Sequence, residues 1–375
     1  MSHHKPRRTA SMLLASQKLR DLTGRQHIVL AGRAAAGIWS LLRVLGFQDR
    51  WVLIPANTCY IVLWAVLHSG SKPFLVDIDP QTGNITPNTL AAALPYQPAA
   101  LIPCHMYGFS APIADLYAWA RDHAVFVIED AALAIGAQAN GQPVGSWGDA
   151  SIFSFGQGKL VDNDIGGAVL TDDQRLAAEV EQLLAGLPTW DNHLADLTDQ
   201  WNQIYWALHQ YEAENPRILE LYPPLFEMFR GLISYRLSDA SWLGLPEALQ
   251  NLTTNLQHRA QMAALYDRML PDILAQTLNR PAGSVLWRYP LCIPVEHRNG
   301  LLRHLWQNNL TEVTRWYPSL RYMRAALAPH LPPQDTPHAD WLGASIINLP
   351  VHTGRAVVKR TISAIRQYFD QTGPA

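Results

Sequence analysis

A lysine and an aspartate, each placed after a strand-like run, are the residues of this sequence best suited to act together chemically. Asp130 ends the run that begins at Val125, and Lys159 follows the next run, 152–153, after a short loop. A lysine amine can form a Schiff base with the aldehyde of pyridoxal phosphate, and a carboxylate can keep the pyridine nitrogen protonated. Because open α/β folds bind ligands at the carboxyl ends of strands, the pair predicts a pyridoxal phosphate site whose ring acts as an electron sink.

Each of these residues also has an ordinary explanation when it is taken alone. An aspartate after a strand is favoured as a helix cap or a turn former. A lysine is most often a solvated surface amine. The sequence positions of Asp130 and Lys159 by themselves leave both alternatives open.

A glycine turn near the N-terminus could hold the phosphate group of such a cofactor. Gly32, Arg33 and Ala34 follow a short strand and open a predicted helix. Free backbone N–H groups, the helix dipole and a guanidinium could therefore converge on a phosphate. Ser154, five residues before Lys159, could add a hydroxyl. The alternatives are an ordinary glycine turn with an exposed arginine and a strand-end serine.

Other kinds of site do not match the sequence. A nucleotide-binding P-loop would need glycine in place of Phe153 and serine or threonine in place of Leu160. No histidine pair has the spacing of metal ligands, and no nucleophile-elbow pattern occurs. The three cysteines are too scattered for a disulfide framework, which predicts a reducing, cytoplasmic location; they are Cys59, Cys104 and Cys292.

Composition also limits the classes of partner that the protein is expected to bind. The 375 residues carry a formal net charge of −2, which provides no electrostatic footprint for nucleic acid or an anionic membrane. No apolar run reaches the roughly 18 residues that a membrane span needs. The apolar stretch 12–15 is short and is closed by the polar residues 16–18, so we expect a cytosolic start instead of a signal peptide. Small-molecule substrates fit this profile.

Short apolar runs alternate with helical patterns in the first half of the chain, which predicts an α/β sheet covered on both faces. The runs are 28–30, 51–54, 74–76, 100–102, 125–128, 152–153 and 167–170, with helices expected at 34–45, 87–94 and 113–123. A helical insert is expected at about 174–232, where Trp201 and its apolar neighbours recur at helical spacing. We interpret the tryptophans of this insert as core residues.

Strand-like runs return at 286–293 and 345–349, around a helical pattern at 301–308, and a last helix is expected at 356–368. This order is typical of a small α+β domain. The sequence therefore predicts a large α/β domain at 1–245, which includes the insert, and a smaller C-terminal domain at 246–375.

Several motifs, taken in order, resemble the DegT/DnrJ/StrS-type sugar aminotransferases, a family of pyridoxal phosphate enzymes of fold type I. The matching segments are 76–80 with 84–85, 103–108, 127–132, 145–149, 153–155 with Lys159, 166–167, 235–239 and 349–352. Together they span nearly the whole chain. The resemblance implies a mostly parallel seven-stranded sheet in the large domain.

The resemblance also assigns roles by position. It makes Lys159 the Schiff-base lysine and Asp130 the partner of the pyridine nitrogen. It makes Ser154 and the turn of Gly32, Arg33 and Ala34 the phosphate site. Tyr60 is the candidate to stack on the ring, since Cys59 stands where the family has an aromatic residue. The substrate candidates are His105, Tyr235 and His352, with a structural role as the alternative for the two histidines.

The sequence departs from the family pattern at further positions. Leu133 stands where the family usually has a glutamine near the cofactor's phenolic oxygen. Ser234 replaces an asparagine that commonly reaches the phosphate of the neighbouring subunit. The segment 160–164 replaces a glycine-rich loop.

The activity implied by the resemblance is transfer of an amino group, with glutamate as donor and a nucleotide-linked keto sugar as acceptor. Such an enzyme would be a cytoplasmic homodimer in polysaccharide, glycolipid or antibiotic sugar biosynthesis. Lys159 argues against the dehydratases of this family, which have histidine in its place. The alternative, suggested by Leu133, Cys59 and Ser234, is a non-catalytic or regulatory binding protein of the same fold.

Overall fold

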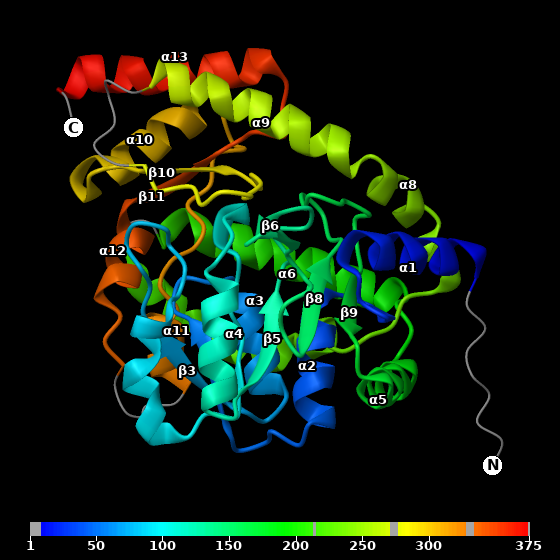
Figure 1. Ribbon diagram of the computed structural model, residues 1–375. Helices are drawn as coiled ribbons and strands as arrows, with labels where there is room; N and C mark the ends of the chain where they lie inside the picture. Colours follow the sequence, from blue (N-terminus) through cyan, green and yellow to red (C-terminus); the bar gives the residue numbers. More distant parts are fainter. Residues whose placement is uncertain (1–8, 213–214, 271–276, 328–333, 374–375) are drawn as a thin grey trace.

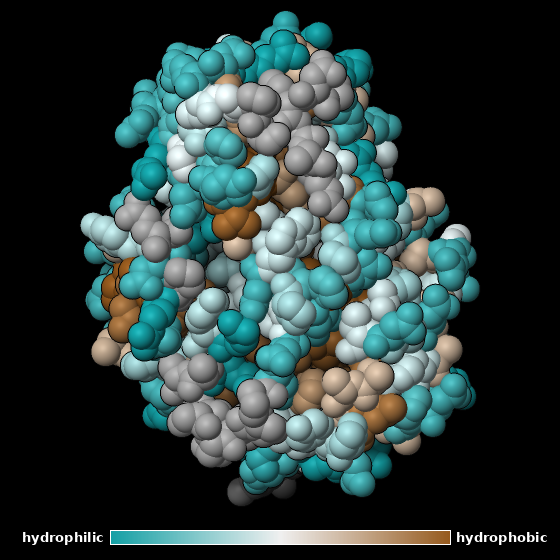
Figure 2. Space-filling model, turned by 90° about the vertical axis from the view of Figure 1, so that its left-hand side faces the viewer, coloured by the Kyte–Doolittle hydropathy of each residue, from teal (hydrophilic) through white to brown (hydrophobic). Residues whose placement is uncertain are grey.

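The computed structural model describes residues 9–212, 215–270, 277–327 and 334–373. A large sheet lies at the centre of the molecule, with helices on both sides of it. A smaller sheet and three long helices form a separate layer at the top of Figure 1. On the face shown in Figure 2, hydrophilic side chains predominate and hydrophobic ones form small separate patches. That face therefore offers no broad apolar surface.

The central sheet has seven strands in the order β1-β9-β8-β5-β4-β2-β3. Their bounds are β1 His27–Ala31, β2 Trp51–Pro55, β3 Lys72–Val76, β4 Ala100–Leu101, β5 Phe126–Asp130, β8 Ala150–Ser154 and β9 Gly167–Thr171. β9 runs antiparallel to β1 and β8, and the other adjacent pairs are parallel. The predicted α/β fold with a mostly parallel seven-stranded sheet is confirmed, and each predicted apolar run is one of these strands.

Helices between the strands cover the sheet because each presents an apolar face to it. They are α2 Ala34–Val44, α3 Tyr60–His68, α4 Ile113–Asp122 and α5 Gln174–Ala185. α2 packs against β8, β9, α3 and α5. The segment predicted as a helix at 87–94 is a 3₁₀ helix, η1 Pro87–Tyr96, with Pro95 inside it. Proline lacks the N–H that a regular helix interior needs.

The segment predicted as an insert, about 174–232, is helical, but its first helix, α5, packs on β1, β9 and α2, so the insert begins after that helix. Its elements are α6 Asn192–Tyr211, η3 Pro216–Leu221, α7 Tyr222–Met228 and η4 Arg230–Leu232. Trp201 of α6 is 5% exposed, and its ring packs in a tilted arrangement against Trp64 of α3 and Phe226 of α7. The tryptophan at this position is therefore a core residue that attaches the insert to the large sheet.

The upper layer contains the two-stranded antiparallel sheet of β10 Tyr289–Cys292 and β11 Ile346–Leu349. Around it lie α9 Leu252–Met269, α10 Val295–Gln307 and α13 Arg355–Thr372 (Figure 1). The two predicted strands and the last helix are confirmed within a few residues, whereas the helix predicted at 301–308 begins earlier, at Val295. The domain boundary near residue 245 stays a prediction; it falls at the start of α8 Leu245–Gln250, which packs on α1 Ala10–Thr23.

The remaining elements are short. They are the β6 Gln138–Ala139 and β7 Gln142–Pro143 hairpin, η2 Met106–Gly108, η5 Asp239–Trp242, α11 Arg321–Leu327 and α12 Pro337–Ser345. No helix in the described part of the chain combines the length and the apolar character that crossing a membrane requires.

Candidate active site

Asp130 is the last residue of β5 and is 7% exposed. Its Oδ1 accepts a hydrogen bond from the N–H of Ala132 (2.9 Å), and its Oδ2 accepts one from the thiol of Cys104 (3.5 Å). Burial raises the pKa of the carboxyl, while the Ala132 N–H, the Lys159 amine and the Cys104 thiol act in the opposite direction. The carboxylate is thus fixed in orientation at the carboxyl edge of the sheet.

The thiol of Cys104 is held in turn by Thr58. Thr58 Oγ1 donates a hydrogen bond to Cys104 Sγ (3.2 Å). Thr58 follows β2, Cys104 follows β4, and Asp130 ends β5, so three adjacent strand ends carry this chain of hydrogen bonds. This role of Cys104 could not be predicted from the sequence, because a single cysteine does not indicate which side chain its thiol will contact.

Lys159 lies in the loop after β8, where its amine approaches the face of the Trp287 ring, 5.6 Å from the ring centroid. Burial lowers the pKa of Lys159; Cys59 and Asp130 raise it, and Arg33 and Arg288 lower it. Lys159 and Asp130 are therefore close enough to influence each other's charge. They form no ion pair within 4.0 Å.

The turn of Gly32, Arg33 and Ala34 joins β1 to α2. Arg33 forms a bridge with Gly166, and Gly167 is paired with Ser154 across β8 and β9, so the structure brings together the residues expected to bind phosphate. A side chain at Gly167 would overlap the backbone nitrogen of Ala34, so only glycine allows this close approach.

The guanidinium of Arg33 has a definite partner. Its Nη1 donates a hydrogen bond to the carbonyl oxygen of Leu232 at the end of the insert (2.5 Å). On the same turn, a side chain at Gly32 would overlap the carbonyl oxygen of Tyr235. The turn is therefore fixed by the end of the insert and by the residues that follow it.

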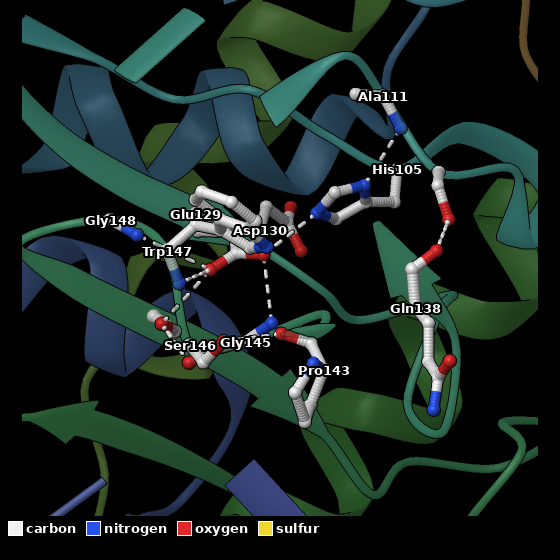
Figure 3. Close-up of polar contacts among 12 residues, drawn as sticks. His105, Ala111, Glu129, Asp130, Gln138, Pro143, Gly145, Ser146, Trp147 and Gly148 are labelled. Atoms are coloured by element: carbon white, nitrogen blue, oxygen red, sulfur yellow. Dashed lines mark hydrogen bonds and ion pairs between the residues drawn. The ribbon is translucent and has the colours of Figure 1, made fainter. Parts of the chain in front are cut away.

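His105 has a structural role in place of the expected one in the substrate pocket. Its Nδ1 accepts a hydrogen bond from the N–H of Ala111 (3.0 Å), so its Nε2 carries the proton and donates it to Glu129 Oε1 (3.0 Å; Figure 3). Glu129 also accepts from the N–H groups of Gly145 (2.7 Å) and Trp147 (2.9 Å). Burial alone would raise the pKa of Glu129, but these hydrogen bonds lower it. Both nitrogens of His105 are therefore already engaged.

Tyr60 likewise differs from the expectation that it stacks on the cofactor. Its ring packs against Trp201, Tyr205 and Phe226, and its hydroxyl accepts a hydrogen bond from Trp201 Nε1 (3.1 Å). Cys59, the preceding residue, is the one that influences the charge of Lys159. Successive residues at a helix start point in different directions, so Tyr60 packs against the insert, whereas Cys59 lies near enough to Lys159 to affect its pKa.

The two remaining substrate candidates differ in accessibility. Tyr235 is 3% exposed and packs against the ring of Trp190 (centroids 4.7 Å apart), which is a core position. His352 keeps a side chain that is 29% exposed, and its Nε2 contacts Glu312 Oε2 (3.1 Å). Burial and the cations of Arg288 and Arg259 lower the pKa of His352. Of the two, only His352 can be reached from solvent.

Sequence reasoning missed Trp287 and Arg288, which come from the C-terminal part of the chain. Trp287 Nε1 donates a hydrogen bond to the carbonyl oxygen of Gly158 (2.9 Å), the residue before Lys159. Arg288 lies close enough to Lys159 to lower its pKa. Nothing in the local pattern at 285–290 indicates that these side chains reach a loop more than a hundred residues earlier.

The residues of this site fit pyridoxal phosphate. A half-buried amine and a buried carboxylate that influence each other's pKa without forming an ion pair suit a ring that carries an aldehyde and, on another edge, a pyridine nitrogen. The start of α2 and Ser154 add N–H and O–H donors suited to a phosphate. The site therefore offers partners for the aldehyde, the pyridine nitrogen and the phosphate of the cofactor, whereas Leu133 offers no hydrogen bond to its phenolic oxygen.

Comparison with known proteins agrees with this arrangement. The sequence pattern of the DegT/DnrJ/EryC1/StrS aminotransferase family matches residues 15–366. The fold is similar to that of a DegT DnrJ EryC1 StrS aminotransferase from Brucella abortus (TM-score 0.76, 22% identity, covering 96% of this chain and 90% of that one).

Two further structures are similar over the same extent. Helicobacter pylori PseC, an aminotransferase involved in the biosynthesis of pseudoaminic acid, gives a TM-score of 0.77 at 18% identity and covers 97% of this chain and 92% of its own. The putative sugar aminotransferase Spr1654 from Streptococcus pneumoniae, solved in its PMP form, gives 0.77 at 20% identity with the same coverage of 97% and 92%.

Proposed function

Because the chain belongs to the DegT/DnrJ/EryC1/StrS aminotransferase family, we propose that it uses pyridoxal phosphate to transfer an amino group from glutamate to a nucleotide-linked keto sugar. The observation that carries this proposal is the half-buried Lys159 amine, with its lowered pKa, close to the buried carboxylate of Asp130. The PMP form of Spr1654 supports the cofactor. The sugar chemistry named for Spr1654 and PseC supports the class of acceptor.

Each residue of the site has a distinct task in this reaction. Pyridoxal phosphate, when bound, supplies an aldehyde that takes up an amine and a protonated ring that withdraws electrons. Asp130 holds the proton on the pyridine nitrogen, and Cys104 and Thr58 orient its carboxylate. The Lys159 amine first holds the cofactor, is displaced by the amino donor, and then takes the proton from the donor's α-carbon.

The lowered pKa of Lys159 suits both of its tasks, because only a neutral amine can attack an aldehyde or accept a proton. Ser154, Gly32, Arg33 and Ala34 are proposed to bind the phosphate through N–H, O–H and guanidinium donors. His352 is proposed to line the substrate entrance, since it is exposed and lies beside Glu312.

We also propose a cytoplasmic homodimer with small-molecule substrates, acting in polysaccharide, glycolipid or antibiotic sugar biosynthesis. The family assignment supports this setting. A non-catalytic or regulatory binding protein remains the second candidate, because Cys59 stands beside Lys159 where the family has an aromatic residue. An aminotransferase turns its substrates over and a regulatory binding protein does not, so an experiment can distinguish the two functions.

The test is spectroscopic. Purified protein with pyridoxal phosphate should show the visible absorption band of a lysine-bound cofactor, and glutamate should bleach it. Lys159→Ala should abolish the band and turnover. Asp130→Asn should keep the band but slow the bleaching by several orders of magnitude, because the carboxylate stabilises the developing charge. Full turnover by Lys159→Ala would refute the assignment, and a band that no amino donor changes would favour the regulatory protein.

A further inference from the structure

Arg288 is a buried cation with unused hydrogen-bonding capacity. Its side chain is 8% exposed, and its Nε has no hydrogen-bond partner among the described residues. A buried N–H group without an acceptor is costly, so such groups usually have a partner or a ligand. The guanidinium is therefore an incompletely satisfied donor.

The contacts that Arg288 does make fix its position without neutralising its charge closely. Its guanidinium carbon lies 5.3 Å from the centroid of Trp287 and 5.1 Å from that of Trp316. Its Nη1 donates to the carbonyl oxygen of Glu312 (2.6 Å), whereas the Glu312 carboxylate is 4.0 Å from Nη2. The indole rings pre-orient the planar fork of donors, which favours binding of a carboxylate or phosphate.

This cation belongs to the site of Lys159. The Lys159 amine and the Arg288 guanidinium both lie over the Trp287 ring, 5.6 and 5.3 Å from its centroid, and the charge of Arg288 adds to the burial that lowers the pKa of Lys159. Arg288 also adds to the burial that lowers the pKa of His352. His352 and Glu312 are 29% and 53% exposed, so this group of residues extends from the lysine to the surface.

We infer that Arg288 binds an oxyanion of the substrates beside the reacting amine, and that the α-carboxylate of the amino donor is the group it takes. The inference rests on the proposed function. In an α-amino acid the carboxylate is attached to the carbon that bears the amine, so a donor reacting near Lys159 carries its charge close to Trp287. The phosphate of a nucleotide-linked acceptor is the other source of the same chemistry.

The test separates these sources by measuring each half-reaction of Arg288→Gln. The variant should need at least about 30-fold more glutamate to half-saturate bleaching of the cofactor band, with little change in the maximal rate, as expected for loss of a buried charge-assisted contact. Regeneration of the band by the keto sugar should be little affected. Arg288→Lys should recover only part of the lost affinity for glutamate, because an ammonium group lacks the planar pair of N–H donors that a guanidinium presents to a carboxylate.

A binding measurement gives a readout that does not depend on turnover. Titration calorimetry of the pyridoxal phosphate-loaded protein with 2-oxoglutarate, which cannot react with that form, should show binding weakened by about 30-fold in Arg288→Gln. Inorganic phosphate serves as the second probe. The matched control is Arg321→Gln, because Arg321 also lies over an aromatic ring, that of Tyr322 (5.5 Å), and pairs with Asp340 away from the site. It should bind both probes like the wild type.

The outcomes are distinct. Loss of phosphate binding and of the keto sugar half-reaction, with 2-oxoglutarate binding intact, would overturn the carboxylate assignment in favour of the acceptor phosphate. Unchanged binding of both probes and unchanged half-reactions in Arg288→Gln would overturn the inference while leaving the aminotransferase assignment intact. A wild-type protein that binds 2-oxoglutarate through Arg288 but never reacts with glutamate would instead refute the proposed function.

Discussion

Trp287 Nε1 donates its hydrogen bond to the carbonyl oxygen of Gly158, so a residue just before β10 holds the backbone next to Lys159. The same indole ring contacts the Lys159 amine. The position of the lysine thus depends on the packing of the C-terminal layer against the loop after β8, and the site is complete only when both are in place.

Trp287→Phe keeps an aromatic face but removes this hydrogen bond. A hydrogen bond of this kind contributes about 0.5–1.5 kcal/mol, so we expect the rate of glutamate-induced bleaching to fall by about 2- to 10-fold. Stopped-flow absorbance measures it. Trp119→Phe is the control, because Trp119 stacks with His123 on α4, far from this loop in the chain. An unchanged rate in Trp287→Phe would show that the bond does not position Lys159.

Cys104→Val should move the acidic limb of the activity profile to higher pH. The thiol donates to Asp130 and lowers the pKa of a carboxyl that burial raises. Without that donor the pKa rises further, so Asp130 becomes protonated, and activity is lost, at a higher pH than in the wild type. Cys104→Ser keeps a donor and should keep the limb in place. Identical pH profiles for the valine and serine variants would contradict a role of the thiol in orienting Asp130.

The rate at which the cofactor-free protein binds pyridoxal phosphate should rise with pH as Lys159 loses its proton. Because the pKa of Lys159 is lowered, the rate should reach its plateau at a lower pH than an ordinary lysine would give. Arg288→Gln removes a cation that lowers this pKa, so the rise should shift to higher pH. Asp130→Asn removes an anion that raises it, so the rise should shift to lower pH. Shifts in the same direction would contradict the proposed arrangement of charges.

Glu129→Gln should destabilise the fold by about 1–3 kcal/mol at neutral pH, because the amide nitrogen that replaces one carboxylate oxygen cannot accept a hydrogen bond from the buried donors of His105, Gly145 or Trp147. The pKa of Glu129 is lowered in the folded protein, so its stabilising effect is present above the unfolded pKa and is lost as pH falls through the folded pKa. Urea unfolding curves of variant and wild type should therefore converge in acid.

The control for that experiment is Glu179→Gln, since Glu179 pairs with Arg175 on the surface of α5. Exposed pairs of this kind add little stability. A Glu129→Gln protein as stable as this control would show that the buried pair is dispensable.

The sequence predicted the sheet well because its strands are buried on both faces and read as short continuous apolar runs. Lys159 and Asp130 could be placed in one region because both follow strands whose ends meet at one edge of the sheet. The direction in which a side chain points at the start of a helix could not be predicted in the same way. Tyr60 was expected near the cofactor, but its ring packs against the insert, and it is the preceding residue, Cys59, that affects the pKa of Lys159. Successive residues at the start of a helix point in different directions.

Contacts between distant parts of the chain were beyond sequence reasoning. Arg288 and Trp287 approach Lys159 only because the upper layer docks on the loop after β8. His105 lies in a motif that suggested a pocket, yet its partners Glu129 and Ala111 are set by the tertiary fold. Hydrogen-bond partners of buried polar groups depend on packing, which local pattern does not encode.

The pairing of β1 with β9 has a consequence for synthesis on the ribosome. β1 lies at the edge of the sheet, and Ile28 pairs with Leu170, so this strand can join the sheet only after most of the large domain has been translated. Until then its backbone is an open edge that other nascent chains could join. Chains stalled before residue 167 should therefore be the species most prone to aggregate.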